Sequence, residues 1–225
     1  MDLKEYVSVR RAYNIVRQRV ASEERLTFEE FAILCRLGAA NEPVKTSAIA
    51  EYQGALRPTM THRTNHLAEL GLIDRGEGPV DRRNVVCTIS GQGTEYVARL
   101  ADLTRAQIST GRSLSRTSSE RICKYVDAMG SLFCKAGDLV LLGLYASEKD
   151  SLTIMELVDA LGLLQPTVSM SVSSLAERGL VERSHEAGGM HTTNVSLTKA
   201  GIEVASALGD KIEEIVVRRK VRSNH

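Results

Sequence analysis

Apolar and polar positions follow the same order in both halves of the chain. In the first half, Thr27 and Glu30 form a capping box that opens a helix with apolar positions through Leu37. A short helix around 48–52 follows, and Pro58 suits the first turn of the next helix. Gly71 suits a left-handed C-cap, and segments 72–73 and 85–87 are typical of short strands around a glycine-rich loop. This order predicts a winged helix-turn-helix.

A shift of 108 residues superimposes the two halves without a gap. Pro58-Thr59 falls on Pro166-Thr167, and Gly71-Leu72 falls on Gly179-Leu180. The second half therefore repeats the pattern over 139–145, 155–161, 165–178, 180–181 and 195–197. We predict a mainly α fold with small β-hairpin wings (α+β), in two domains at 1–108 and 109–225. Their winged-helix cores are predicted at about 26–100 and 136–208.

The segments outside these cores predict helices suited to dimerisation. Near the start, apolar residues at spacings of 3 and 4 form a narrow seam: Tyr6, Val9, Tyr13, Val16 and Val20. Another stripe lies near the end: Val204, Leu208, Ile212 and Ile215. The stretch 109–119 is rich in serine and threonine and indicates a hinge or broken helix, after which a helix is expected over 120–133. We expect the two domains to form an intramolecular pseudo-dimer, and two chains could still pair through the outer helices.

Composition excludes several classes of protein. Of the 225 residues, 43% are hydrophobic and 25% are charged, which is typical of a folded soluble protein. The formal net charge is +1, so affinity for nucleic acid must come from local patches. No apolar run is long enough for a membrane span, and the start lacks a signal-peptide core. The four cysteines fit buried thiols in a reducing cytoplasm. With no P-loop, dinucleotide fingerprint or nucleophile elbow, we expect neither an enzyme nor a cofactor.

Two segments resemble the recognition-helix region of a known family. RPTMTHRTNHLAELGLIDR and QPTVSMSVSSLAERGLVER, with VDRRNVVCTISGQG and LTKAG, are similar to the MarR family of bacterial transcription regulators. The resemblance implies binding of double-stranded DNA, a repressor function and a small-molecule effector. Family members usually carry one such unit and bind DNA as dimers, so this chain resembles a fused pair.

The predicted recognition helix of the first half has one polar and one apolar side. The apolar side is expected to face the core with Met60, Thr64 and Leu67. The polar side offers hydrogen-bond donors and acceptors suited to bases and phosphates: Arg57, Thr59, Thr61, His62 and Asn65. In the predicted wing, Asp81 would orient Arg82 or Arg83, which could enter the minor groove. The alternatives are a solvated helix face and a hairpin with surface salt bridges.

The second half has weaker DNA-binding chemistry. Its corresponding helix face carries mainly short polar side chains: Gln165, Thr167, Ser169 and Ser173, with Met170 among them. Its wing, 186–191, has no arginine. We therefore predict asymmetric recognition, with residues 57–83 dominant. The alternative function is a winged-helix module that binds protein and has lost DNA binding.

Three further groups of residues each have two interpretations. His62 and His66 are spaced as a metal pair, but they lie on an exposed face without a completing cysteine, and no metal site is predicted. The peroxide-sensing branch of the family carries a reactive cysteine in its first helix, and Cys123 lies in the second half's equivalent of that helix; the other interpretation is a buried structural cysteine. Three tyrosines could line a crevice for a phenolic effector or pack in the core: Tyr6, Tyr13 and Tyr96.

Overall fold

A computed structural model describes residues 1–78, 84–109, 114, 116–185 and 193–217. The first winged unit comprises residues 28–106, with helices α2 (Phe28–Ala39), α3 (Thr46–Tyr52), α4 (Arg57–Glu69) and α5 (Gly91–Ala106). Its strands are β1 (Val44–Lys45), β2 (Ile73–Glu77) and β3 (Val85–Ile89). Helix α1 (Leu3–Arg19) and a 3-10 turn, Ser22–Glu24, precede it.

The second winged unit comprises residues 136–213 and repeats these elements. Its helices are α7 (Ala136–Tyr145), α8 (Ile154–Leu161), α9 (Gln165–Glu177) and α10 (Lys199–Glu213). Its strands are β4 (Leu152–Thr153), β5 (Val181–His185) and β6 (Thr193–Leu197). Each of these elements begins 108 residues after its counterpart, so the repeat in the sequence is a repeat in the fold. Helix α6 (Ser119–Met129) precedes this unit.

Each unit holds one small antiparallel sheet, in the orders β1-β3-β2 and β4-β6-β5. The registers also repeat, since Ile73 pairs with Ile89 and Val181 pairs with Leu197. The predicted α+β winged-helix fold is confirmed.

Local signals in the sequence account for the ends of the helices. Thr27 and Glu30 form the predicted capping box of α2, and Pro58 lies in the first turn of α4. Gly71 and Gly179 both have φ 69°, the left-handed conformation predicted at Gly71. The helix predicted over 120–133 was too long, because α6 ends at Met129 before Gly130.

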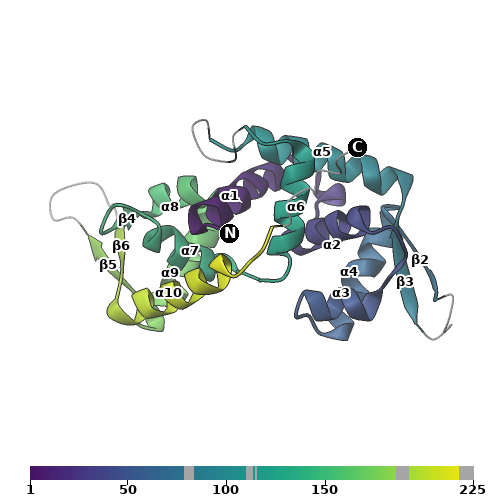
Figure 1. The fold of residues 1–225 in the computed structure, drawn as a ribbon. Helices are drawn as coiled ribbons and strands as arrows, with labels where there is room; N and C mark the ends of the chain where they lie inside the picture. Colours follow the sequence, from purple (N-terminus) through teal and green to yellow (C-terminus); the bar gives the residue numbers. More distant parts are fainter. Residues whose placement is uncertain (79–83, 110–113, 115, 186–192, 218–225) are drawn as a thin grey trace, which may run out of the picture.

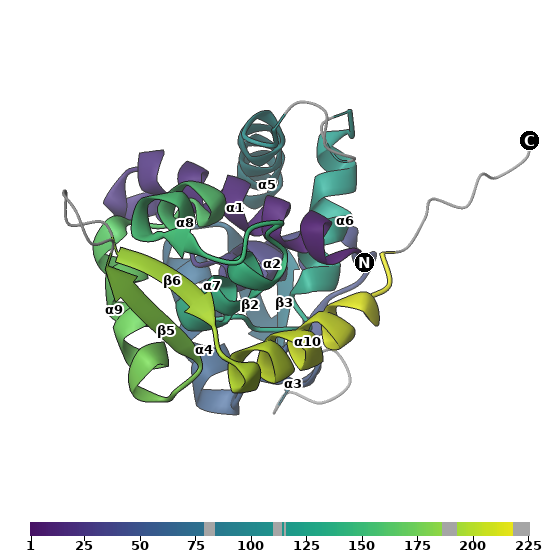
Figure 2. The same ribbon diagram turned by 90° about the vertical axis from the view of Figure 1, so that its left-hand side faces the viewer.

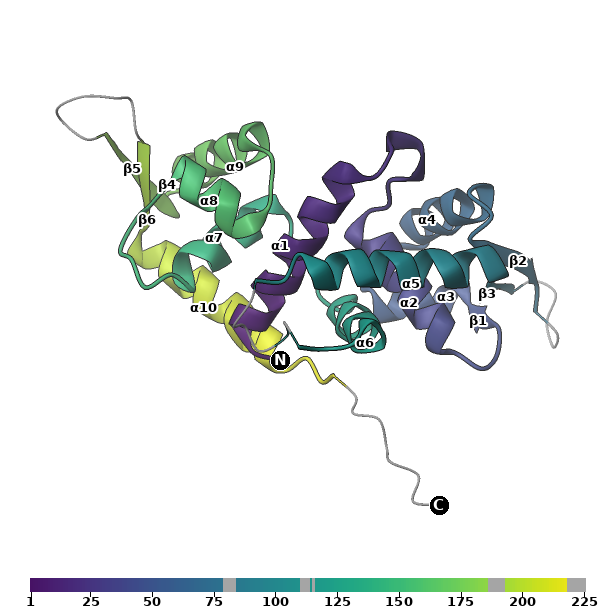
Figure 3. The same cartoon turned by 90° about the horizontal axis from the view of Figure 1, so that it is seen from above.

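The two winged units lie at opposite ends of the molecule, with β2–β3 at one end and β5–β6 at the other (Figure 1). Helix α1 crosses the middle of the molecule between them (Figure 3). It packs against α5 of the first unit and against α7, α8 and α10 of the second. Helix α6 packs mainly against α2 and α5, although it precedes the second unit in sequence. The leading helices thus join the two units.

The predicted seam of α1 is part of the core. Tyr6, Val9, Tyr13 and Val16 are all buried. The stripe predicted near the end is only partly correct: Ile212 and Ile215 are buried, but Val204 is 36% exposed. The buried positions of α10 begin instead at Gly201 and Ala205, because glycine and alanine allow close packing there. The boundary between 108 and 109 stays a prediction.

Candidate nucleic-acid interface

Helix α4 has one buried and one exposed side, as the sequence predicted. Met60, Thr64 and Leu67 are fully buried and anchor the helix to the core. The hydroxyl of Thr64 donates to the carbonyl oxygen of Met60 (3.0 Å), so its polar group is satisfied within the helix. The predicted contact residues all lie exposed: Arg57, Thr59, Thr61, His62 and Asn65. The helix therefore presents a polar face on a rigid support.

Two arginines near this face are held by protein groups. Arg63 donates to Oε1 of Gln53 (3.1 Å), and its guanidinium lies 4.9 Å from the ring centroid of Phe133. Arg75 of β2 donates to Oδ1 of Asn65. This contact engages the amide oxygen of Asn65 and fixes the orientation of the amide, so the amide nitrogen can still donate to a ligand. Sequence reasoning did not indicate these partners.

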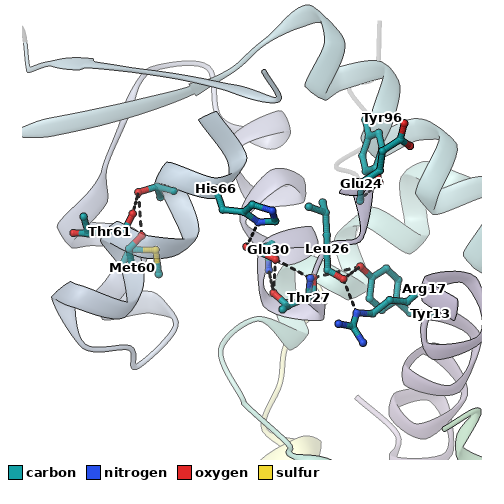
Figure 4. A network of polar contacts seen from close by, with 11 residues as sticks. Tyr13, Arg17, Glu24, Leu26, Thr27, Glu30, Met60, Thr61, His66 and Tyr96 are labelled. Carbon is teal, nitrogen blue, oxygen red and sulfur yellow. Dashed lines mark hydrogen bonds and ion pairs between the residues drawn. The ribbon is translucent and has the colours of Figure 1, made fainter. Parts of the chain in front are cut away.

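A polar network connects α4 to α2 and α1 (Figure 4). Nδ1 of His66 lies 2.7 Å from Oε1 of Glu30, whose carboxylate also accepts from the backbone N–H of Thr27 (2.7 Å). The neighbouring carbonyl oxygen of Leu26 accepts from the hydroxyl of Tyr13 (2.9 Å). His66 therefore faces a buried carboxylate, while His62 lies exposed one turn earlier. Helix α4 is therefore connected to α1 through this network.

Helix α9 presents a less polar face than α4. Gln165 is exposed, whereas Thr167, Ser169 and Ser173 are partly buried. Gln165 donates to the hydroxyl of Ser169 (3.1 Å). Met170, at the position of His62, is 75% exposed. The arrangement leaves fewer side-chain donors for a ligand than α4 offers.

Both helices face the same side of the molecule. They occupy the lower half of Figure 1, one in each winged unit, and both lie toward the lower left of Figure 2. One surface can therefore contact both helices. The predicted wing residues Asp81, Arg82 and Arg83 lie outside the described residues, as does the second wing segment 186–191. The described part of the first hairpin ends where Gly78 donates to the carbonyl oxygen of Asn84 (2.7 Å).

The three tyrosines predicted for an effector crevice have different environments. Tyr6 and Tyr13 are buried, and burial raises the pKa of both phenols well above its usual range. Tyr96 lines a cavity of about 290 Å³ together with Glu24, Leu72 and Arg99. Its hydroxyl donates to the carbonyl oxygen of Glu24 (2.5 Å). A second cavity of about 380 Å³ lies between α1 and the α7–α8 region.

Cys123 lies in α6 and contacts Cys35 of α2, a partner that sequence reasoning missed. The neighbouring thiol of Cys35, as a hydrogen-bond donor, lowers the pKa of Cys123. Burial raises the pKa values of Cys35, Cys87 and Cys134. The contact between α2 and α6 joins residues 88 positions apart, so no local sequence pattern indicates it. Cys123 is also the only one of the four that is partly exposed.

We expect an alkylating reagent to modify Cys123 at least about tenfold faster than the other three cysteines in the folded protein at pH 8. The reason is that the thiolate reacts, and only Cys123 combines a lowered pKa with exposure. Peptide mass mapping after timed iodoacetamide treatment measures the four rates. Equal rates would contradict the assignment, and denatured protein provides the control because all four thiols are then exposed.

The described residues contain no group of three or more His, Cys, Asp or Glu side chains that could hold a metal ion. Among these same residues, every helix is too short or too polar to cross a lipid bilayer.

Comparison with known proteins identifies the repeated unit. Models of the MarR family match residues 26–85 and 139–189. An uncharacterised HTH-type transcriptional regulator of Mycobacterium bovis is 31% identical over 101 residues, which cover 39% of this chain and 68% of that protein. Among solved structures, BldR of Sulfolobus solfataricus is 23% identical (TM-score 0.34; 37% of this chain and 58% of that one). MepR of Staphylococcus aureus in complex with DNA is 29% identical (TM-score 0.34; 37% and 61%).

The repeated helix-turn-helix with its hairpin defines a tandem winged helix-turn-helix protein. The chain belongs to the MarR family of transcription regulators, and it carries the family's unit twice.

Proposed function

We propose that this protein is a sequence-specific regulator that binds double-stranded DNA in the bacterial cytoplasm and represses transcription. The observation that carries the proposal is the exposed donor-bearing face of α4 on a buried anchor of Met60, Thr64 and Leu67. Arg57 suits guanine and Asn65 suits adenine in the major groove, while Thr59 and Thr61 suit phosphates. His62 lies on the same exposed face.

A single chain would act as a pseudo-dimer. Helices α4 and α9 lie on one side of the molecule, and the leading helices join the two units. Symmetric regulators place two recognition helices in successive major grooves, about 34 Å apart. In this proposal the second unit contacts DNA more loosely through Gln165, Thr167, Ser169 and Ser173. A further homodimer would double the site.

An effector would regulate binding from the cavity beside Tyr96. This cavity lies between the end of α4 and the start of α5, since it is lined by Leu70, Leu72 and Gln92. A ligand there would press on the helix that carries the DNA-binding face. The aromatic ring and Arg99 suit an aromatic or anionic molecule. Tyr13 lies near this region in the core, because its hydroxyl donates to the carbonyl oxygen of Leu26, whereas the hydroxyl of Tyr6 donates to that of Leu132.

Duplex binding measured at several salt concentrations tests the DNA-binding proposal. The logarithm of affinity should fall linearly with the logarithm of salt, because each neutralised phosphate releases counterions. In the variant Arg82→Ala/Arg83→Ala, the slope should become shallower by about 1.8, since each charge contributes about 0.9. An unchanged slope would contradict the role of the wing. No duplex binding even at low salt would favour the protein-interaction alternative.

A further inference from the structure

Helix α1 of the N-terminal half holds the turn of the second helix-turn-helix. The side-chain amide of Asn14 donates to the carbonyl oxygen of Leu161 (2.9 Å). The amide of Gln18 donates to the carbonyl oxygen of Gly162 (2.6 Å), and Nε of Arg11 donates to that of Asp159 (2.6 Å). Three donors spaced along one side of α1 thus bind the end of α8, and α9 begins at Gln165, three residues after Gly162.

These bonds satisfy backbone groups that a helix end leaves open. The last carbonyl groups of a helix have no partner within the helix, and other donors must bind them when they are buried. Leu161 and Gly162 are both buried. Three side chains from a helix about 145 residues earlier in the chain supply the donors. The second helix-turn-helix is therefore completed by α1.

Gly162 allows the close approach of α1. Its φ of 61° is left-handed, and a Cβ at this position would lie 2.6 Å from the carbonyl oxygen of Arg11 and 2.9 Å from Cγ1 of Ile15. The corresponding glycine of the first unit, Gly54, has φ 56° but has no described heavy atom within 4 Å of such a Cβ. The two turns have the same backbone conformation, and of the two only the second is packed against α1.

The other side of α1 is attached to the first unit. The hydroxyl of Tyr13 and Nε of Arg17 each donate to the carbonyl oxygen of Leu26, both at 2.9 Å. Leu26 precedes the capping box of α2, whose Glu30 contacts His66 of α4. One helix therefore contacts, directly or through one short network, the elements that carry both recognition helices.

We infer that Arg11, Asn14 and Gln18 are positioning residues that set the distance between the two DNA-reading helices. This inference rests on the proposed DNA-binding function. Because α1 is a continuous helix, its two attachments fix α9 relative to α4. The protein then requires a fixed number of base pairs between its two half-sites, although none of these three side chains touches DNA.

The test compares Gly162→Ala with Gly54→Ala. Both alanines adopt a left-handed conformation and carry a similar backbone strain, so differences between them report the contact with α1. We expect hydrogen exchange of the amides in 154–166 to become at least tenfold faster in Gly162→Ala, and that of the corresponding amides in 46–58 to change much less in Gly54→Ala. The double variant Asn14→Ala/Gln18→Ala leaves the glycine intact and should show the same faster exchange in 154–166. It tests the contact even if Gly162→Ala does not fold. Asn41→Ala, at an exposed asparagine, is its control.

The DNA readout is a set of duplexes that differ by one base pair in the spacing of the half-sites. We expect the unmodified protein to prefer one spacing about tenfold over its neighbours, and the Asn14→Ala/Gln18→Ala variant to retain about a twofold preference. A purely structural role would lower affinity equally at all spacings. An equal loss at every spacing, or an unmodified protein indifferent to spacing, would overturn the positioning role. Absence of DNA binding would overturn the proposed function, while hydrogen exchange would still decide whether α1 holds the turn.

Discussion

Replacing Arg57 and Asn65 together by alanine is expected to weaken binding to the cognate duplex about 100-fold. In the proposed complex each residue contacts a base edge, and such contacts contribute about 1–3 kcal/mol each. Both side chains are exposed on α4, and the bond from Arg75 holds the amide of Asn65 in one orientation. Titration of a labelled duplex at fixed salt measures the loss.

The matched variant is Gln165→Ala/Ser173→Ala, at the corresponding positions of α9. We expect a loss of less than about fivefold, because Ser173 is partly buried and Gln165 is hydrogen-bonded to Ser169. The operator should then have one strict and one tolerant half-site. Equal losses in the two variants would mean that the second unit binds through backbone or water-mediated contacts, and recognition would not be asymmetric.

Replacing Gly93 by alanine is expected to lower the free energy of unfolding by at least about 3 kcal/mol. Gly93 is the third residue of α5, and a Cβ there would collide with the carbonyl oxygen of Leu72. That oxygen already accepts from the backbone N–H of Ser90 (3.1 Å). Relief would need movement of the backbone at the start of β2. In a chain of this size, the melting temperature should fall by about 10 °C.

Gly91 is the control for this prediction, because it lies in the same helical turn and a Cβ there meets nothing within 4 Å. Gly91→Ala should leave stability unchanged or raise it by about 0.5 kcal/mol, since alanine favours the helix. Denaturant unfolding followed by circular dichroism compares the two. An equal loss of unfolding free energy from both substitutions would show that the close approach of Gly93 to Leu72 does not limit the residue at position 93. Gly201, the counterpart of Gly93, faces the carbonyl oxygen of Leu180 in the same way.

Local and periodic features of the sequence predicted most of the fold. Three local features set the ends of helices through residues only a few positions away: the capping box at Thr27, the proline in the first turn of α4 and the left-handed Gly71. The gapless repeat then extended the proline and glycine predictions to Pro166 and Gly179, whereas Lys135 stands at the position of Thr27. The polar face of α4 was also predictable, because a helix of 3.6 residues per turn separates exposed Arg57 and Asn65 from buried Met60. The roles of the wing residues Arg82 and Arg83 remain predictions.

The chain by itself thus determined that there are two winged helix-turn-helix units and which face of each recognition helix is polar, because short-range periodicity and capping encode both. Only the tertiary structure decided which polar side chains already have a partner within the protein. The guanidinium of Arg63 lies over the ring of Phe133, the thiol of Cys123 lies beside that of Cys35, and the amide of Asn14 donates to the carbonyl oxygen of Leu161. Each of these contacts joins residues at least 70 positions apart. Only the packing of α1 and α6 across the two units brings such residues together, and no local pattern in the sequence specifies that packing.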